Sequence, residues 1–513
     1  MKKILNEYKK QITYFFTNKI YVICVIIVAL LSYGFTITHY SIGIDDLCFD
    51  RYVDGNYILV AKRWGTWLLY NLLNIHNFTP FWLDLLTTLN IIFIAILICS
   101  FLRKNLKNKI NEIPYTIFSC ILISSPIIFN FYFYQTTSLS VSFSAIIMIS
   151  FEILLFENFF ENNNNRTINI ILGILTAVPI SMYESCIQIF LVMCGLSIFI
   201  RSLTSKDKPI QIIKFLFLNL VTLLIGFTIY YLIGSVIIVY LKKNGKYVVN
   251  FAFEKIPWES KEFREKTFAE KIEYLVDQTK KVNTLSWIKD PTIYFNFAII
   301  TIVFLMEIYN LIKNKKVIRF LSIIMILLSN FLLCILQGVI LYRTELSLSI
   351  TIALSWLYLF YRFSNIKYLK YIFSIFTILF ILLQTQVITK MFYIEYQRFE
   401  KEKNIAINIG LDITKNFNYS NKPVLYTGIS NENPNGEVLR YGITAFNEFG
   451  VETTKFINNF GFHLKCIKQD KATIHEAVSE INNVKEKFQD NNCSIIETDK
   501  YIIVDLEKYG LKK

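Results

Sequence analysis

Long runs of apolar residues recur along the chain from residue 20 to residue 389 and alternate with short polar connections. A run of about 17–25 apolar residues has the length of a transmembrane helix. Such runs predict spans near residues 20–38, 82–102, 113–130, 138–156, 168–182, 187–203, 210–239, 292–312, 318–340, 347–361 and 370–389. The pattern therefore predicts an α-helical polytopic membrane protein with about eleven transmembrane helices.

The chain changes character after residue 398, where long apolar runs give way to a mainly polar tail. Three segments of the tail have regular patterns, two typical of strands and one typical of a helix: Val424–Gly428, Tyr501–Asp505 and Ala472–Phe488. A tail of this length is sufficient for a small domain with its own core. We therefore expect a polytopic domain over residues 1–398 and a small α/β domain over residues 399–513.

Charge gives the expected orientation. The 513-residue chain has a formal net charge of +14, which in a soluble protein would suggest nucleic acid as a partner, but the basic residues gather in every second connection between the apolar runs. This positive-inside pattern predicts a cytoplasmic amino terminus and, with an odd number of spans, an extracytoplasmic tail. It also places the connection 240–290 outside, where apolar residues at roughly helical spacing favour amphipathic helices on the membrane surface.

Two adjacent carboxylates, Asp45 and Asp46, follow the first apolar run in a chain that mostly keeps acids out of its hydrophobic stretches. Ionisable groups at a membrane boundary are energetically expensive and are often functional. A carboxylate can remove the proton of a sugar hydroxyl, and cations can hold a phosphate leaving group. We therefore interpret the pair as catalytic, and a solvated acidic loop is the competing interpretation.

Other charged and aromatic residues lie in connections that the same topology places on the side of the aspartates. We expect them to bind substrate: Lys62, Arg63, Tyr183, Glu184, Lys242, Lys243 and Arg343. Several also have a structural interpretation. Arg63, which precedes Trp64, can anchor the chain at the interface, Glu184 can be a buried polar contact, and Arg343 can be a snorkelling residue at a helix end.

Motifs for other chemistry are missing from the sequence. The nine cysteines form no Cys-x-x-Cys pair, the four histidines have no ligand-like spacing, and the Walker and Gly-x-Ser-x-Gly motifs are absent. We therefore expect no metal site and no cofactor, although the adjacent carboxylates Asp45 and Asp46 are able to hold Mg²⁺ or Mn²⁺.

The segments Gly43-Ile44-Asp45-Asp46 and Lys62-Arg63-Trp64-Gly65 are similar to those of the Gtr type II glucosyltransferases, membrane enzymes that glucosylate O-antigen during serotype conversion. The segment Pro179–Glu184 resembles a turn in the middle of that family's proteins, where glutamine often stands at the position of Glu184. The segments Phe392–Glu400 and Lys422–Gly428 resemble the family's passage into its outward tail domain.

The resemblance implies a GT-C-type glycosyltransferase in the cytoplasmic membrane of the cell envelope. Its donor is expected to be undecaprenyl-phosphate-glucose, supplied by a companion synthase and flippase, and its acceptor a polysaccharide or lipid-linked glycan on the outer face. Asp45 or Asp46 then becomes the base and Arg63 a helper in the same loop. Two other functions stay open: a polysaccharide flippase or polymerase, and a membrane-anchored glycan-binding protein that acts through its tail.

Overall fold

The computed structural model describes residues 2–43, 46–48, 57–106, 112–161, 164–204, 209–244, 265–274, 291–332, 344–363, 366–417, 422–427, 446, 450–467, 473, 476 and 494–509. The contacts divide the chain into two compact units. The first consists of Met1–Thr38 and Arg51–Lys390, and the second of His39–Asp50 and Met391–Lys513. The boundary expected after residue 398 falls inside a helix, α20 (Lys367–Asn416), because this helix continues without a break where the composition changes.

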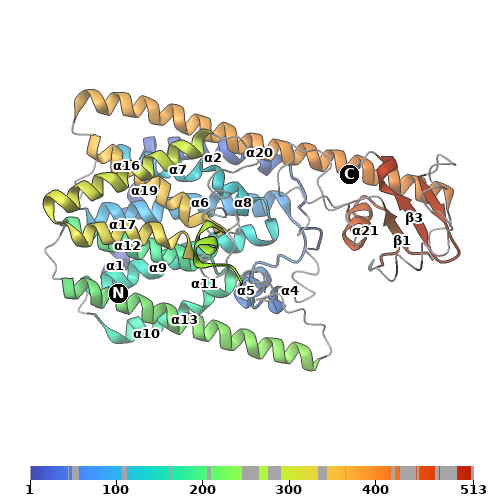
Figure 1. Cartoon of the computed structure of the whole chain (residues 1–513), viewed down its shortest axis with the longest axis horizontal. Coiled ribbons are helices and arrows are strands. Elements are labelled where there is room, and N and C mark those ends of the chain that lie inside the picture. Colours follow the sequence, from blue (N-terminus) through green and yellow to red (C-terminus); the bar gives the residue numbers. More distant parts are fainter. Residues whose placement is uncertain are drawn as a thin grey trace. The chain divides into compact units, whose positions relative to one another are not determined.

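The first unit is a bundle of helices (Figure 1). With the amino-terminal part of α20, its α-helices are α1 (Lys2–Thr17), α2 (Lys19–Thr38), α4 (Tyr57–Val60), α5 (Trp64–Leu72), α6 (Pro80–Asn105), α7 (Glu112–Ile123), α8 (Phe129–Tyr132), α9 (Gln135–Phe160), α10 (Arg166–Leu175), α11 (Ala177–Met182), α12 (Cys186–Thr204), α13 (Pro209–Lys243), α16 (Pro291–Asn314), α17 (Val317–Ser329) and α19 (Leu346–Phe363). In the part of the chain that the structure describes, nine helices are long and apolar enough to cross a membrane.

Two shorter apolar stretches, Arg166–Met182 and Val317–Ser329, are helical where two further spans are expected. Each predicted apolar run thus contains helix within the described residues, because a single segment that crosses a bilayer satisfies its backbone groups internally only as a helix. The chain is a helical polytopic membrane protein. The count of eleven spans stays a prediction.

Small polar residues join the central helices of the bundle. Helix α6 packs against α9, and α12 against α17. Buried serines on α9 meet polar side chains on α6, with a hydrogen bond from Thr87 to Ser138 (3.3 Å) and one from Asn90 to Ser142 (3.1 Å). Small side chains allow helix backbones to approach closely in a membrane, and such hydrogen bonds fix the pairing.

The amino-terminal segment forms an additional helix that the hydropathy pattern does not predict. Helix α1 packs against α6, where Lys104 forms ion pairs with Glu7 (3.0 Å) and Glu157 (2.6 Å). Tyr8 also donates to Glu157 (2.6 Å). Lys104, one of the basic residues that indicate the orientation, is therefore also ion-paired with acidic residues of the bundle.

The connection 240–290 is described after α13 only for residues 265–274. Residues 268–274 are helical, and the helix starts with a capping box in which the amide of Thr267 donates to Glu270 (2.7 Å) and the amide of Glu270 to the Thr267 hydroxyl (3.4 Å). The other amphipathic helices expected in this connection lie outside the described residues.

The second unit contains a three-stranded sheet of order β1-β3-β2. Strand β1 (Val424–Thr427) runs parallel to β3 (Ile502–Asp505), and β2 (Ile495–Glu497) is antiparallel to β3. Both strands expected from the sequence are present, whereas β2 was not predicted because its apolar stretch is only two residues long. The helix expected at 472–488 lies outside the described residues, apart from 473 and 476.

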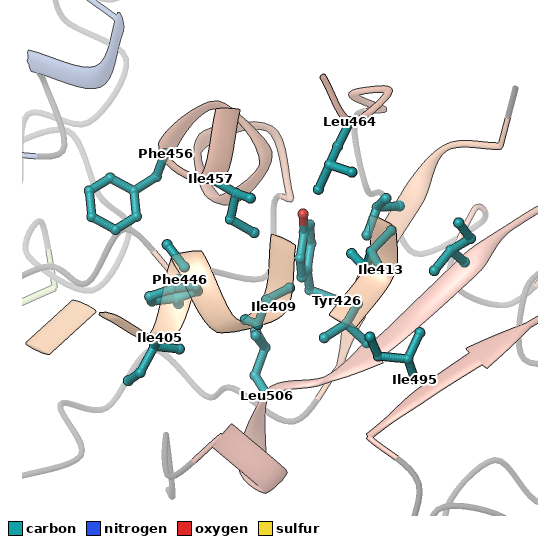
Figure 2. Packing of buried hydrophobic residues seen from close by; sticks show 14 of the residues in the cluster. Ile405, Ile409, Ile413, Tyr426, Phe446, Phe456, Ile457, Leu464, Ile495 and Leu506 are labelled. Atoms are coloured by element: carbon teal, nitrogen blue, oxygen red, sulfur yellow. The ribbon is translucent and has the colours of Figure 1, made fainter. Parts of the chain in front are cut away.

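The core of the second unit is shown in Figure 2, where side chains from α20, α21 (Val451–Asn458) and the sheet converge. Ile409 and Ile413 of α20 pack with Tyr426 of β1 and Ile457 of α21. The same cluster contains Leu47, which comes from the first connection more than three hundred residues earlier in the chain. The connection that carries the candidate aspartates is therefore part of the second unit.

Candidate functional site

Lys62 and Arg63 lie in the turn between α4 and α5. The amide of Arg63 donates to the carbonyl of Ile58 (2.9 Å) and the amide of Lys62 to that of Leu59 (3.0 Å), which is the hydrogen-bond pattern of a Schellman helix end. Lys62 has φ 59°, in the left-handed region that favours glycine. A side chain in that conformation costs about 1–2 kcal/mol. Such an outlier suggests a functional role for the lysine.

The Lys62 side chain is held by α13. Its Nζ lies 3.7 Å from the ring centroid of Tyr231, within the range of a cation–π interaction. Its aliphatic stem passes Gly234, where a Cβ would lie only 3.0 Å from the Cβ and Cγ of Lys62. Only 8% of Lys62 is exposed. A glycine and a tyrosine on one helix therefore hold a largely buried ammonium in place.

Arg63 faces the turn after α11. Its Nη2 lies 3.5 Å from Glu184 Oε2, and its guanidinium carbon lies 4.6 Å from the ring centroid of Tyr183. The other carboxylate oxygen of Glu184 accepts a hydrogen bond from the Tyr230 hydroxyl (3.1 Å). Both charged side chains keep contact with solvent, with 19% of the Arg63 side chain and 29% of the Glu184 side chain exposed. The arginine is thus oriented by its neighbours and accessible to an anionic ligand.

Close packing of α5 on α11 brings these residues together. A Cβ at Gly65 would collide with Ser181 Oγ and would lie 2.8 Å from the Val178 carbonyl oxygen. Thr66 donates to the Met182 carbonyl (2.7 Å). Gly65 therefore has a structural role, because only glycine permits this close approach of α5 to α11.

These contacts define a basic–tyrosine cluster within the first unit, formed by Lys62, Arg63, Tyr183, Glu184, Tyr230 and Tyr231. The structure brings together the four members that the sequence predicts. The two tyrosines of α13 were missed because they lie inside an apolar run. The sequence feature that could have identified them is the Tyr230-Tyr231 pair, which lies between Gly226 and Gly234.

Asp46 belongs to the second unit, at the start of the 3-10 helix η1 (Asp46–Cys48). Its Oδ2 accepts a hydrogen bond from the Gly43 amide (3.1 Å), and its own amide donates to the Gly43 carbonyl (3.1 Å). Asp46 is 3% exposed. The carboxylate is therefore fixed by a tight turn. Asp45 lies outside the described residues, so a metal site formed by this pair stays a hypothesis.

Lys242 and Lys243 are not part of the cluster. Lys242 and Lys243 end α13 and are exposed. A rise of about 1.5 Å per residue places Lys242 roughly 16 Å along the helix from Tyr231. Arg343 lies outside the described residues. Next to its turn, Glu345 is buried, and this burial raises the pKa of its carboxyl to about 8.

A family model described as Glucosyl transferase GtrII matches residues 33–361. No curated protein and no solved structure matches the chain. The matched range includes the Asp46 turn and the whole basic–tyrosine cluster, and it ends within α19.

Proposed function

The chain belongs to the GtrII glucosyl transferase family, and from this premise we propose that it moves glucose from a polyprenyl-phosphate donor to a polysaccharide or lipid-linked glycan on the outer face of the cytoplasmic membrane. The observation that carries the proposal is that two consecutive cations, Lys62 and Arg63, are each held over a tyrosine ring in the basic–tyrosine cluster. A forked guanidinium suits two phosphate oxygens, and a lysine adds a compact charge beside it.

In the proposed reaction an acceptor hydroxyl attacks the anomeric carbon of glucose. Asp46 or Asp45 accepts the hydroxyl proton as the new C–O bond forms, and the bond from the sugar to the phosphate oxygen breaks. Lys62 and Arg63 stabilise the negative charge that stays on the departing polyprenyl phosphate. Glu184 and Tyr183 keep the Arg63 guanidinium oriented, and Arg343, Lys242 and Lys243 remain further candidates for the phosphate.

One contact supports an orientation with the termini on opposite sides of the membrane. Leu47 shares a core with Ile457 and Val504 of the tail, so the first connection and the tail lie on the same side of a bilayer. The chain between the first connection and the tail must therefore cross the membrane an even number of times. Helix α2, which precedes the first connection, adds one more crossing. The total is then odd, as in both nine and eleven spans. Reporter fusions after Lys109 and Lys316 should read as cytoplasmic and a fusion at Lys513 as external.

Transfer kinetics on purified protein with a defined polyprenyl-phosphate glucose test the assignment. We expect Asp46→Asn to lower the rate by about a hundredfold if Asp46 is the base, with normal protein abundance. Arg63→Met should raise the KM for the donor more than the KM for the acceptor. Arg166→Met, which removes an exposed charge at the start of α10, is the matched control.

Normal transfer by Asp46→Asn, Asp45→Asn and the double variant would remove the aspartates from the reaction. A chain that moves lipid-linked glycan across the membrane without transferring sugar would instead support the flippase interpretation. Deletion of the tail with full retention of transfer would exclude a tail-based binding function.

A further inference from the structure

The turn that carries Asp46 is hydrogen-bonded to α20 through the Ile42–Gly43 peptide group. Arg398 Nη2 donates to the carbonyl oxygen of Ile42 (3.4 Å), and the amide of the next residue, Gly43, donates to Asp46 Oδ2 (3.1 Å). This carbonyl and this amide belong to the same conjugated peptide unit. A cation at the carbonyl oxygen polarises the unit and makes its N–H a stronger donor. Arg398 therefore acts on Asp46 without touching it.

Arg398 is itself held in a fixed orientation. Its Nε lies 2.8 Å from Glu395 Oε2 and its Nη1 lies 2.8 Å from Glu402 Oε2, one turn away on either side along α20. The Arg398 side chain is 9% exposed, and the two carboxylates are 0% and 8% exposed. With two of its nitrogens fixed by buried carboxylates, the guanidinium presents the third nitrogen to Ile42.

The other end of the turn is held by the core of the second unit. Leu47, which follows Asp46, is buried in the same cluster as Phe399 of α20 and Phe456 of α21. Helix η1 packs against α21. The Asp46 carboxylate is thus held by the hydrogen bond from the Gly43 amide, and the chain directly after it is held by the burial of Leu47.

We propose that Arg398 is a positioning residue for the transfer reaction. Through the Ile42–Gly43 peptide it orients the Asp46 carboxylate and favours its charged, proton-accepting form. This inference rests on the proposed function, because it needs Asp46 to act as the base. It also gives the second unit a role in catalysis that requires no contact of Arg398 with substrate.

The pH profile of transfer distinguishes this role from a purely structural one. A hydrogen bond to a carboxylate favours the charged form, so weakening that bond leaves the base protonated up to a higher pH. Within the second unit, the charged residues of α20 are Glu395, Arg398, Glu400, Lys401, Glu402, Lys403, Asp412 and Lys415, and those of α21 are Glu452 and Lys455. Of these, Arg398 donates a hydrogen bond to the carbonyl of the Ile42–Gly43 peptide.

The experiment compares Arg398→Met with Lys403→Met in the full-length protein. Lys403 lies on the same helix and pairs with Glu400 at 3.3 Å, but both side chains are about one-third exposed, at 33% and 34%. For Arg398→Met we expect a kcat lower by about ten- to a hundredfold, a nearly unchanged donor KM, and an acidic limb of the pH profile displaced to higher pH. Arg398→Lys should recover part of the kcat, and Lys403→Met should resemble the wild type.

Loss of Arg398 alone removes its ion pairs with two buried carboxylates, Glu395 and Glu402, which can prevent folding. The triple variant Glu395→Gln, Arg398→Met and Glu402→Gln removes the three charges together and should show the same loss and the same displaced limb. The inference is overturned if Arg398→Met or the triple variant folds and shows the kcat and pH profile of Lys403→Met. Asp46→Asn, measured in parallel, separates the two proposals. If it is inactive while the Arg398 variants are normal, only the positioning role fails. If it is fully active, Asp46 is not the base and the positioning role fails with it, while the proposed transfer reaction then depends on Asp45.

Discussion

Replacement of Gly234 by alanine is expected to displace Lys62 while keeping its charge. The new Cβ would lie 3.0 Å from the Cβ and Cγ of Lys62 and 3.2 Å from its Cδ. Ordinary contacts between carbon atoms are about 3.5–4.0 Å. The lysine stem must therefore move by roughly 0.5–1 Å, and the Nζ leaves its place 3.7 Å from the Tyr231 ring centroid.

The substitution has opposing effects on stability. An alanine within a helix is favoured over glycine by roughly 0.5–1 kcal/mol, whereas overpacking costs about 1–3 kcal/mol. We therefore expect a net destabilisation of less than about 2.5 kcal/mol. Misplacement of a substrate-positioning group by about 1 Å can reduce a rate by a hundredfold. Transfer at low donor concentration should accordingly fall by about tenfold or more.

The matched control is Gly34→Ala in α2, where no heavy atom lies within 4 Å of the new Cβ. Both variants and Lys62→Met are compared by thermal unfolding in detergent and by donor-dependent transfer. Lys62→Met should be impaired at least as much as Gly234→Ala. If Gly234→Ala matches Gly34→Ala in donor KM and rate while Lys62→Met is impaired, the packing argument is refuted. If all three are normal, Lys62 has no part in donor binding.

Three further results follow from the described contacts. Glu184→Gln should keep transfer within about threefold of the wild type, because an amide oxygen still accepts from Tyr230 and a long, partly exposed ion pair at 3.5 Å contributes little. Glu184→Ala removes both contacts and should lower transfer more. Gly410→Ala should destabilise the second unit by about 1–3 kcal/mol, detectable by limited proteolysis, because its Cβ would collide with the Phe462 ring. Because the folded state retains a proton on Glu345 up to a pKa of about 8, its contribution to stability falls as pH rises from about 5 to 8; the melting temperature should fall over this range and fall less in Glu345→Gln.

The apolar runs predicted the membrane helices well because their length alone requires a helical backbone in a bilayer. Lys62 and Glu184 were selected from the sequence, since ionisable groups next to a membrane span are rare and therefore conspicuous. The structure places both in the basic–tyrosine cluster, and their role stays a prediction. Helix α1 had a readable signal in the spacing of its buried residues Ile4 and Tyr8, but the search for long apolar runs does not detect an amphipathic helix.

Other parts of the site were not predictable from local pattern. The left-handed conformation of Lys62 closes the Schellman end of α4, a position that favours glycine and for which lysine has no preference. Tyr230 is part of an apolar run, and its contact with Glu184 depends on how α11 packs against α13. The link from Arg398 to the Asp46 turn joins residues far apart in the chain, and neither sequence neighbourhood indicates the other.

The presence of Leu47 in the core of the second unit has a consequence for biosynthesis. Its partners Ile495, Ile502 and Leu506 leave the ribosome more than four hundred residues after it, long after the first connection has crossed or met the membrane. Until they are synthesised, the turn that holds Asp46 lacks these partners in its core. A chain released early therefore carries every residue of the basic–tyrosine cluster but an incompletely supported aspartate turn. The packing around the Asp46 turn is therefore completed only after the strands of the second unit have been synthesised.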